Sequence, residues 1–221
     1  EMNLICSKKV KFDYDNRNRR VRKRVISWTG SAWNESSPDQ DWRFVYDQWN
    51  VVLVLDGRDG EDEGTEPDNT TVRKYTWGLD LSGLANVAQP PSAGIHNAGG
   101  IGGLLACAET TGDLAGSYWF FCDANGNVGQ VLKASDQSIA ARYEYDPYGR
   151  KIVATGDYAD ANPYRFSTKW LDKEVVSGEL YYNDNRYYLP RLGRWASRDP
   201  IEDAGGVNLY AFVANSPTDA V

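Results

Sequence analysis

One short pattern recurs along the chain and limits what it can fold into. An Asp is followed three positions later by Asn or Gly in YDNRN (14–18), YDQWN (46–50), CDANG (122–126) and YDPYG (145–149). The aspartates are Asp15, Asp47, Asp123 and Asp146, and their partners are Asn18, Asn50, Gly126 and Gly149. Asn and Gly tolerate positive φ, and an Asp carboxylate can accept hydrogen bonds from turn backbone. Each unit therefore predicts a hairpin turn that ends in a left-handed residue.

The sequence around these turns alternates as strands do. FDYD and RFVYD precede turns, whereas NVVLVLD and RKIVATG follow them. In RRVRKRVIS, Val21 and Val25 fall on one face of a strand, and Arg20, Arg22 and Arg24 fall on the other. Because a single hairpin leaves unpaired edges and an uncovered face, we expect the hairpins to join in one sheet.

Two insertions interrupt the series of hairpins. The first, at 57–69, is acidic and rich in turn residues, which indicates a solvated loop. The second, at 89–106, is rich in glycine and predicts a tight crossing before a buried strand. Its GGIGGLL stretch has neither the GxGxxG spacing nor a following Lys-Ser/Thr, so we expect no nucleotide site there.

Composition favours an all-β fold and argues against nucleic acid as a partner. The chain has 14 Tyr, 8 Trp and 21 Gly, which suit pleated surfaces and tight turns. Its 24 basic and 31 acidic residues give a net charge of -7, which repels phosphate backbones. The basic run RNRRVRKR (17–24) could bind an anionic partner, but it is typical of an exposed strand face balanced by nearby acids.

Cysteine usage and hydropathy predict no metal, no cofactor and no membrane span. Cys6, Cys107 and Cys122 have no CxxC spacing, so we expect no zinc site. No apolar run approaches the ~20 residues that cross a bilayer, and the first residues lack a signal-peptide hydrophobic region. The chain opens inside strand-like sequence and stops at SPTDAV, so we expect a fragment of something longer.

A series of motifs between residues 75 and 217 resembles a known family. The motifs are YTWGLDLSG (75–83), GGIGGLL (99–105), YEYDPYGR (143–150), NPYRFSTKWLD (162–172), LYYNDNRYYLPRLGRWASRDPI (180–201) and GGVNLYAFVANSP (205–217). The chain is similar to the C-terminal end of RHS/YD-repeat proteins. The resemblance implies a YD-repeat sheet over 1–161 and an RHS repeat-associated core domain over 162–221, truncated at its C-terminal end.

The resemblance implies a hollow, spiralling β-sheet shell that the core domain closes. In bacterial members the shell encloses a C-terminal effector, often a toxin, and the protein is secreted or displayed at the cell surface. The expected partners are thus the rest of the shell and an effector, and the acidic balance would suit a basic effector such as a nuclease. Cell-surface relatives use a similar barrel for adhesion, so an extracellular carbohydrate-binding or adhesion module with surface glycans as partners is an alternative.

The resemblance also raises the question of self-cleavage at Asp199. In many family members two Asp-Pro-x-Gly motifs each supply a carboxylate of an aspartyl autoprotease that releases the cargo. Asp199 and Pro200 match the first motif, and Arg198 is a neighbour that could lower the Asp199 pKa, but Glu202 replaces the glycine. The second Asp would fall beyond Val221, so we expect no catalysis here and a structural role in which Asp199 caps a turn and pairs with an arginine.

A cluster of aromatic and Arg side chains at 181–195 allows two interpretations. As a binding surface for sugars or a peptide, it would use Tyr187, Tyr188, Arg194 and Trp195. As part of the core, its tyrosine pairs would place one ring on each side of a strand, so about half of the rings would face inward. The second interpretation is favoured, and together these observations predict a non-enzymatic structural module.

Overall fold

The computed structural model describes residues 8–58, 69–83, 98–175, 179–201 and 207–217, which form two antiparallel sheets. The long sheet consists of β1 (Lys8–Tyr14), β2 (Arg20–Ser27), β3 (Gln40–Asp47), β4 (Asn50–Asp56), β5 (Thr70–Trp77), β6 (Leu104–Glu109), β7 (Gly116–Cys122), β8 (Val128–Lys133), β9 (Ile139–Tyr145) and β10 (Lys151–Thr155). The core sheet consists of β11 (Trp170–Asp172), β12 (Leu180–Asn183), β13 (Arg186–Leu189) and β14 (Arg194–Trp195). Short 3-10 turns are η2 (Phe166–Thr168), η3 (Pro190–Leu192) and η5 (Val213–Asn215). Within these ranges no helix is long and apolar enough to cross a membrane.

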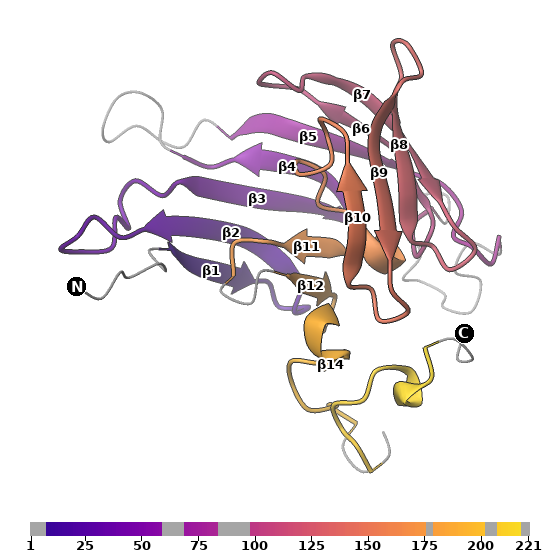
Figure 1. Cartoon of the computed structure of the whole chain (residues 1–221). Coiled ribbons are helices and arrows are strands. Elements are labelled where there is room, and N and C mark those ends of the chain that lie inside the picture. The colour runs from indigo at the N-terminus through magenta and orange to yellow at the C-terminus, as the bar shows by residue number, and fades with distance from the viewer. Residues whose placement is uncertain (1–7, 59–68, 84–97, 176–178, 202–206, 218–221) are drawn as a thin grey trace.

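The long sheet is a meander in which every strand pairs with the next one along the chain. Figure 1 shows it as one curved, twisted sheet that does not close into a barrel. The twist follows from the backbone sterics of L-residues, and it makes the sheet concave on one side. The predicted all-β fold and curved sheet are therefore confirmed.

The YD units occupy one end of the strands. Alternate connections of an antiparallel meander lie at the same end, and the units form the turns after β1, β3, β7 and β9. The remaining connection at this end, between β5 and β6, is the long stretch 78–103, described at 78–83 and 98–103. The irregular spacing of the units thus has a simple cause, because an insertion replaces one turn of the series. We call turns 15–19, 48–49, 123–127 and 146–150, with the glycine crossing 98–103, the turn row.

The glycine-rich insertion behaves as predicted where the structure describes it. Gly99, Gly100 and Gly102 have φ values of 120°, 94° and 77°, which other residues rarely adopt. The crossing leads into β6, whose Leu104 is 1% exposed. Residues 59–68 of the predicted acidic loop and residues 89–97 of this insertion lie outside the described residues.

The core sheet lies across the concave side of the long sheet, where β11 and β12 are seen in front of the purple strands in Figure 1. Trp170 of β11 is the centre of the contact and is 3% exposed. Its ring meets Trp42, Phe44 and Tyr164 edge to face, with centroids 5.9, 5.1 and 5.4 Å away. Edge-to-face pairs add about 0.5–1.5 kcal/mol each beyond area burial. One aromatic cluster therefore joins the two sheets.

The predicted exposure of the basic run on β2 is wrong for two of its residues. Arg20 and Lys23 are each 1% exposed. The register shift between Asp13 and Tyr14 pairs Tyr14 with Arg20 and skips Val21, so Arg20 turns to the same face as Lys23 and Val25. A bulge in the pairing, which alternation in the sequence does not reveal, thus turns Arg20 into the interior, whereas Lys23 already lies on the Val25 face by alternation.

Candidate functional site

Three turns of the turn row share one hydrogen-bond pattern. The Oδ1 atoms of Asp15, Asp123 and Asp146 each accept hydrogen bonds from the backbone N–H groups two and four residues later, at 2.8–3.0 Å. The N–H group three residues later donates to the Asp carbonyl oxygen. These third residues are Asn18, Gly126 and Gly149, with φ of 60°, 75° and 79°. The Asp fixes the turn, and the Asn or Gly supplies its left-handed position.

Burial and hydrogen bonding shift the pKa of Asp15, the first of these aspartates, in opposite directions. Desolvation alone would raise the pKa of Asp15, but hydrogen bonds from Arg19 and Arg17 and the charge of Arg19 lower it below its usual value. Arg19 also donates through Nη1 to the carbonyl oxygen of Gln48, at 2.7 Å. The first turn is therefore tied to the second.

The second turn differs from the prediction. Asp47 pairs directly with Asn50 across a two-residue turn, and the left-handed residue is Gln48, with φ of 53°. Asn50 is the first residue of β4. Its carboxamide donates to the carbonyl oxygen of Ala98 and accepts from the N–H of Gly100, both at 3.1 Å. Bonding to the glycine crossing holds Asn50 in the strand, so it does not take the predicted turn position.

We call the described part of residues 162–221 the core region. Its side chains form hydrogen bonds with the turn row along most of the length of that row. The Tyr182 hydroxyl accepts a hydrogen bond from the N–H of Arg20 beside the first turn, at 2.9 Å. Thr168 Oγ1 accepts from the N–H of Gly102 and donates to the carbonyl oxygen of Gly126, at 2.8 and 2.7 Å. The Tyr188 hydroxyl donates to the carbonyl oxygen of Tyr148 in the fourth turn, at 2.7 Å. Burial raises the pKa of Tyr182 to about 12, so its hydroxyl stays neutral near pH 7.

A buried charge cluster joins the sheets beside these contacts. Asp172 of β11 is 0% exposed and forms ion pairs with Arg20 and with Lys23, whose Nζ lies 2.9 Å from Asp172 Oδ1. Lys23 also pairs with Glu174 at 2.6 Å. Arg20 lies over the Tyr182 ring, 4.4 Å from its centroid. Sequence patterns did not single out Asp172. The available signal for its burial was its place directly after Trp170 and Leu171 in a short strand.

A cavity of about 430 Å³ lies between the second turn and the core region. Its walls include Trp49 and Trp77 from the long sheet, Tyr164 from the connecting segment, and Trp170 and Tyr182 from the core sheet. Lys169 and Asp184 also line it and form an ion pair at 2.9 Å. The core region thus faces the second turn across a cavity rather than by direct bonding.

The residues predicted as a binding surface do not form one exposed patch. Tyr188 is 2% exposed and packs on Phe212, with ring centroids 4.3 Å apart. Tyr187 is half-buried, and its hydroxyl lies 2.6 Å from that of Tyr14. Trp195 is half-buried and Arg194 is exposed. The Trp195 ring packs edge to face on Phe212 at 5.7 Å, and the Arg194 guanidinium lies 5.9 Å from the centroid of the Tyr210 ring. All four side chains therefore contact other residues of the fold.

Asp199 lies in a turn and pairs with an arginine. Its Oδ2 accepts a hydrogen bond from Arg186 Nη1 at 2.8 Å, and its Oδ1 accepts from the N–H of Ile201 at 3.1 Å. The partner is therefore Arg186, whereas Arg198, the neighbour predicted from sequence, is exposed. The two aspartates that follow Asp199 in the sequence, Asp203 and Asp219, lie outside the described residues.

The cysteines and acidic residues show no reactive or metal-binding arrangement where the structure describes them. Cys107 is a buried free thiol, and burial raises its pKa to about 12. Cys122 is free and half-buried, and burial raises its pKa too. Among the described residues, no group of three His, Cys, Asp or Glu side chains could hold a metal ion.

Comparison with known proteins identifies relatives among bacterial toxins. The chain is 42% identical over 92 residues, 42% of its length, to the toxin protein Tse5 of Pseudomonas aeruginosa. It is 37% identical over 82 residues, also 37% of its length, to the toxin subunit YenC2 of Yersinia entomophaga. It is 26% identical over 212 residues, 93% of its length, to the tRNA3(Ser)-specific nuclease WapA of Bacillus spizizenii. The chain spans only 7 or 8% of the length of these relatives. No protein-family model matches it.

Solved structures show the same fold. The crystal structure of TcdB2-TccC3-TEV superposes with a TM-score of 0.62 at 20% identity, covering 98% of this chain and 9% of that one. The Photorhabdus luminescens Tc holotoxin pore superposes with a TM-score of 0.60 at 22% identity, covering 96% of this chain and 8% of that one. The repeated turns, the two sheets and these relatives agree: the homologues of this chain are RHS/YD-repeat toxin proteins, and its C-terminal core region fits that resemblance.

Proposed function

We propose that this chain is the closing end of a shell that encloses an effector. The observation that carries the proposal is the reach of the core region. Its side chains bond beside the first turn through Tyr182, at the glycine crossing and third turn through Thr168, and at the fourth turn through Tyr188. A core region that is hydrogen-bonded from the first hairpin to the last covers one end of the long sheet. In a closed shell it would obstruct the opening at that end.

The mechanism is steric, and it needs no chemistry from the chain. The remaining shell and a downstream effector are the partners, and the protein acts outside the cell or at the surface of a bacterium. Three relatives are named as toxins, toxin subunits or nucleases, which supports an effector as the partner. The net charge of -7 favours a basic effector.

Protease protection tests the proposal. The chain is placed in its full-length repeat protein, with a protease-sensitive reporter of effector size behind residue 221. We expect the reporter to resist digestion in the parent and to be cut at least about tenfold faster in Asp172→Asn, where Arg20 and Lys23 lose the carboxylate that pairs with both. Glu35→Gln, on the surface, should leave protection unchanged. Equal cleavage of the reporter in parent and Asp172→Asn, with the long sheet intact by circular dichroism, overturns the proposal.

A further inference from the structure

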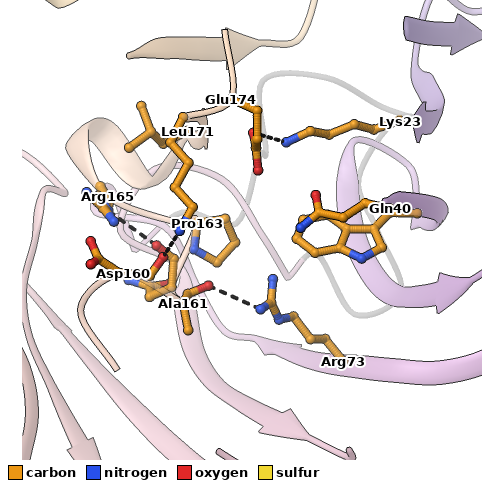
Figure 2. Close-up of a pocket in the computed structure, with 12 residues that line it drawn as sticks. Lys23, Gln40, Arg73, Asp160, Ala161, Pro163, Arg165, Leu171 and Glu174 are labelled. Carbon is orange, nitrogen blue, oxygen red and sulfur yellow. Dashed lines mark hydrogen bonds and ion pairs between the residues drawn. The ribbon is translucent and has the colours of Figure 1, made fainter. Parts of the chain in front are cut away.

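A second, smaller pocket lies between the long sheet and the segment that crosses it. Its volume is about 140 Å³. Residues of β2, β3 and β5 form one wall, and residues 160–165 and 171–174 form the other. Figure 2 shows charged side chains from both walls gathered around this space. The effector-shell proposal assigns no role to it.

Arg73 contributes a hydrogen-bond donor that has no partner. Its Nε donates to Glu109 Oε1 at 2.6 Å, and its Nη2 donates to the carbonyl oxygen of Ala161 at 3.1 Å. Its Nη1 is buried and has no hydrogen-bond partner, and the side chain as a whole is only 8% exposed. Figure 2 shows the guanidinium turned toward the space enclosed with Gln40 and Pro163. A buried N–H group without a partner is costly, so an acceptor in the pocket would be stabilising.

Gln40 contributes an unpaired acceptor on the same wall. Its Oε1 is buried and has no hydrogen-bond partner. Gln40 and Arg73 both line this pocket (Figure 2). The pocket thus presents one free donor and one free acceptor. A ligand that matches it must both accept and donate a hydrogen bond.

The second wall carries two cations, Arg165 and Lys173, and two carboxylates, Asp160 and Glu174. Arg165 is 2% exposed, and its Nε and Nη2 donate to the carbonyl oxygens of Asn162 and Ala159. The Nζ of Lys173 donates to the carbonyl oxygen of Asp160 at 2.9 Å. Within the described part of the chain, neither cation forms a salt bridge with a carboxylate, since Glu174 pairs with Lys23. Lys23 and Arg73 on the first wall bring the lining to four cations against two carboxylates, so the pocket as a whole favours an anion.

We propose that this pocket binds a phosphate group, with free hydrogen phosphate as the preferred form. A phosphate oxygen would accept from Arg73 Nη1, and the P–OH group that the free ion keeps near pH 7 would donate to Gln40 Oε1. Near pH 7 sulfate carries no proton and offers hydrogen-bond acceptors but no donor, so it leaves Gln40 Oε1 unpaired. A phosphomonoester, with a second pKa near 6, has mostly lost that proton and binds less tightly than the free ion.

Calorimetric titration of the full chain at pH 7 with inorganic phosphate, sulfate and glycerol phosphate tests this. At matched ionic strength we expect one saturable phosphate site, with sulfate at least about tenfold weaker and glycerol phosphate between them. If glycerol phosphate binds more tightly than the free ion, the source is an ester and the role of the P–OH group is wrong. The absence of saturable binding overturns the site altogether.

Variants separate a built site from non-specific attraction. Lys173→Met removes an exposed cation and should weaken phosphate binding by about fivefold or more. Gln40→Met should abolish the preference for phosphate over sulfate. Lys74→Met makes the same change of charge at an exposed position of β5, and it should leave binding unchanged. If phosphate and sulfate bind equally to the parent and both lysine variants behave alike, the result is an adventitious ion only.

Discussion

At the scale of single residues, three of the four turn aspartates, Asp15, Asp123 and Asp146, each organise a five-residue turn with one carboxylate oxygen. Asp146 Oδ1 accepts two backbone hydrogen bonds in the fourth turn, from Tyr148 and Arg150. Asp146→Ala leaves both N–H groups to water, so we expect the free energy of unfolding to fall by about 1–2 kcal/mol. Urea unfolding followed by fluorescence measures it. Asp157→Ala, at an exposed position, should change it by less than about 0.5 kcal/mol, and equal losses would contradict the assigned role.

Asp199 is the residue for which a catalytic role in self-cleavage and a structural role in a turn make different predictions. An Asn keeps the acceptor for the N–H of Ile201 but loses the charge that faces Arg186. We expect Asp199→Asn to lower the free energy of unfolding by about 1 kcal/mol or less, because the pair is partly exposed. Mass spectrometry should find the same intact chain in both proteins. A cleaved fragment in the parent that the Asn variant lacks would show self-cleavage.

At the scale of elements, a surface carboxylate ties β1 to the connection between β2 and β3. Glu35 accepts from Lys9 at 2.9 Å and Lys11 at 2.5 Å, and these hydrogen bonds lower its pKa to about 2. Its folded pKa is below its unfolded value near 4.3, so its stabilising effect is present above that value and is lost as pH falls toward 2. An NMR titration should place its midpoint near pH 2, and Lys11→Met should raise it. A midpoint near pH 4.3 in the parent would rule out the two-lysine contact.

How far elements can be predicted depends on whether their cause is local. The Asp-x-x-Gly/Asn units predict three turns because the hydrogen bonds stay within five residues. The second unit departs because Asn50 bonds to residues 98 and 100, far along the chain. Arg20 and Lys23 were expected on a surface, yet a bulge turns Arg20 inward, and a carboxylate 149 residues beyond Lys23 pairs with both cations. Such long-range causes leave no local pattern.

At the scale of the whole molecule, Asp172 couples the two sheets. Asp172→Asn removes the carboxylate that pairs with both Arg20 and Lys23, and it leaves Lys23 paired with Glu174. Removing one member of a buried pair costs about 3–5 kcal/mol, so we expect the core sheet to open before the long sheet unfolds. Hydrogen exchange in β11 and β12 should accelerate more than exchange in β7 and β8. Uniform acceleration across both sheets would mean that they unfold as one unit.

The candidate site was predictable in outline but not in its contacts. The motifs over 162–217 place the core region, and its tyrosine pairs predict rings that face inward, as Tyr181 and Tyr188 do at 2% exposure each. Thr168 is an ordinary polar residue in sequence, and its role depends on the glycine crossing more than sixty residues earlier. The buried pairing of Asp172 likewise requires both sheets to be in place.

The central claim is that the core region is seated on the turn row, and amide hydrogen exchange tests it most directly. The N–H groups of Arg20 and Gly102 donate to core side chains, Tyr182 and Thr168. If the core region is seated, both amides exchange as slowly as strand amides of β7, and Thr168→Val accelerates exchange at Gly102 but not at Arg20. Fast exchange at both amides in the parent, with β7 protected, would contradict the account.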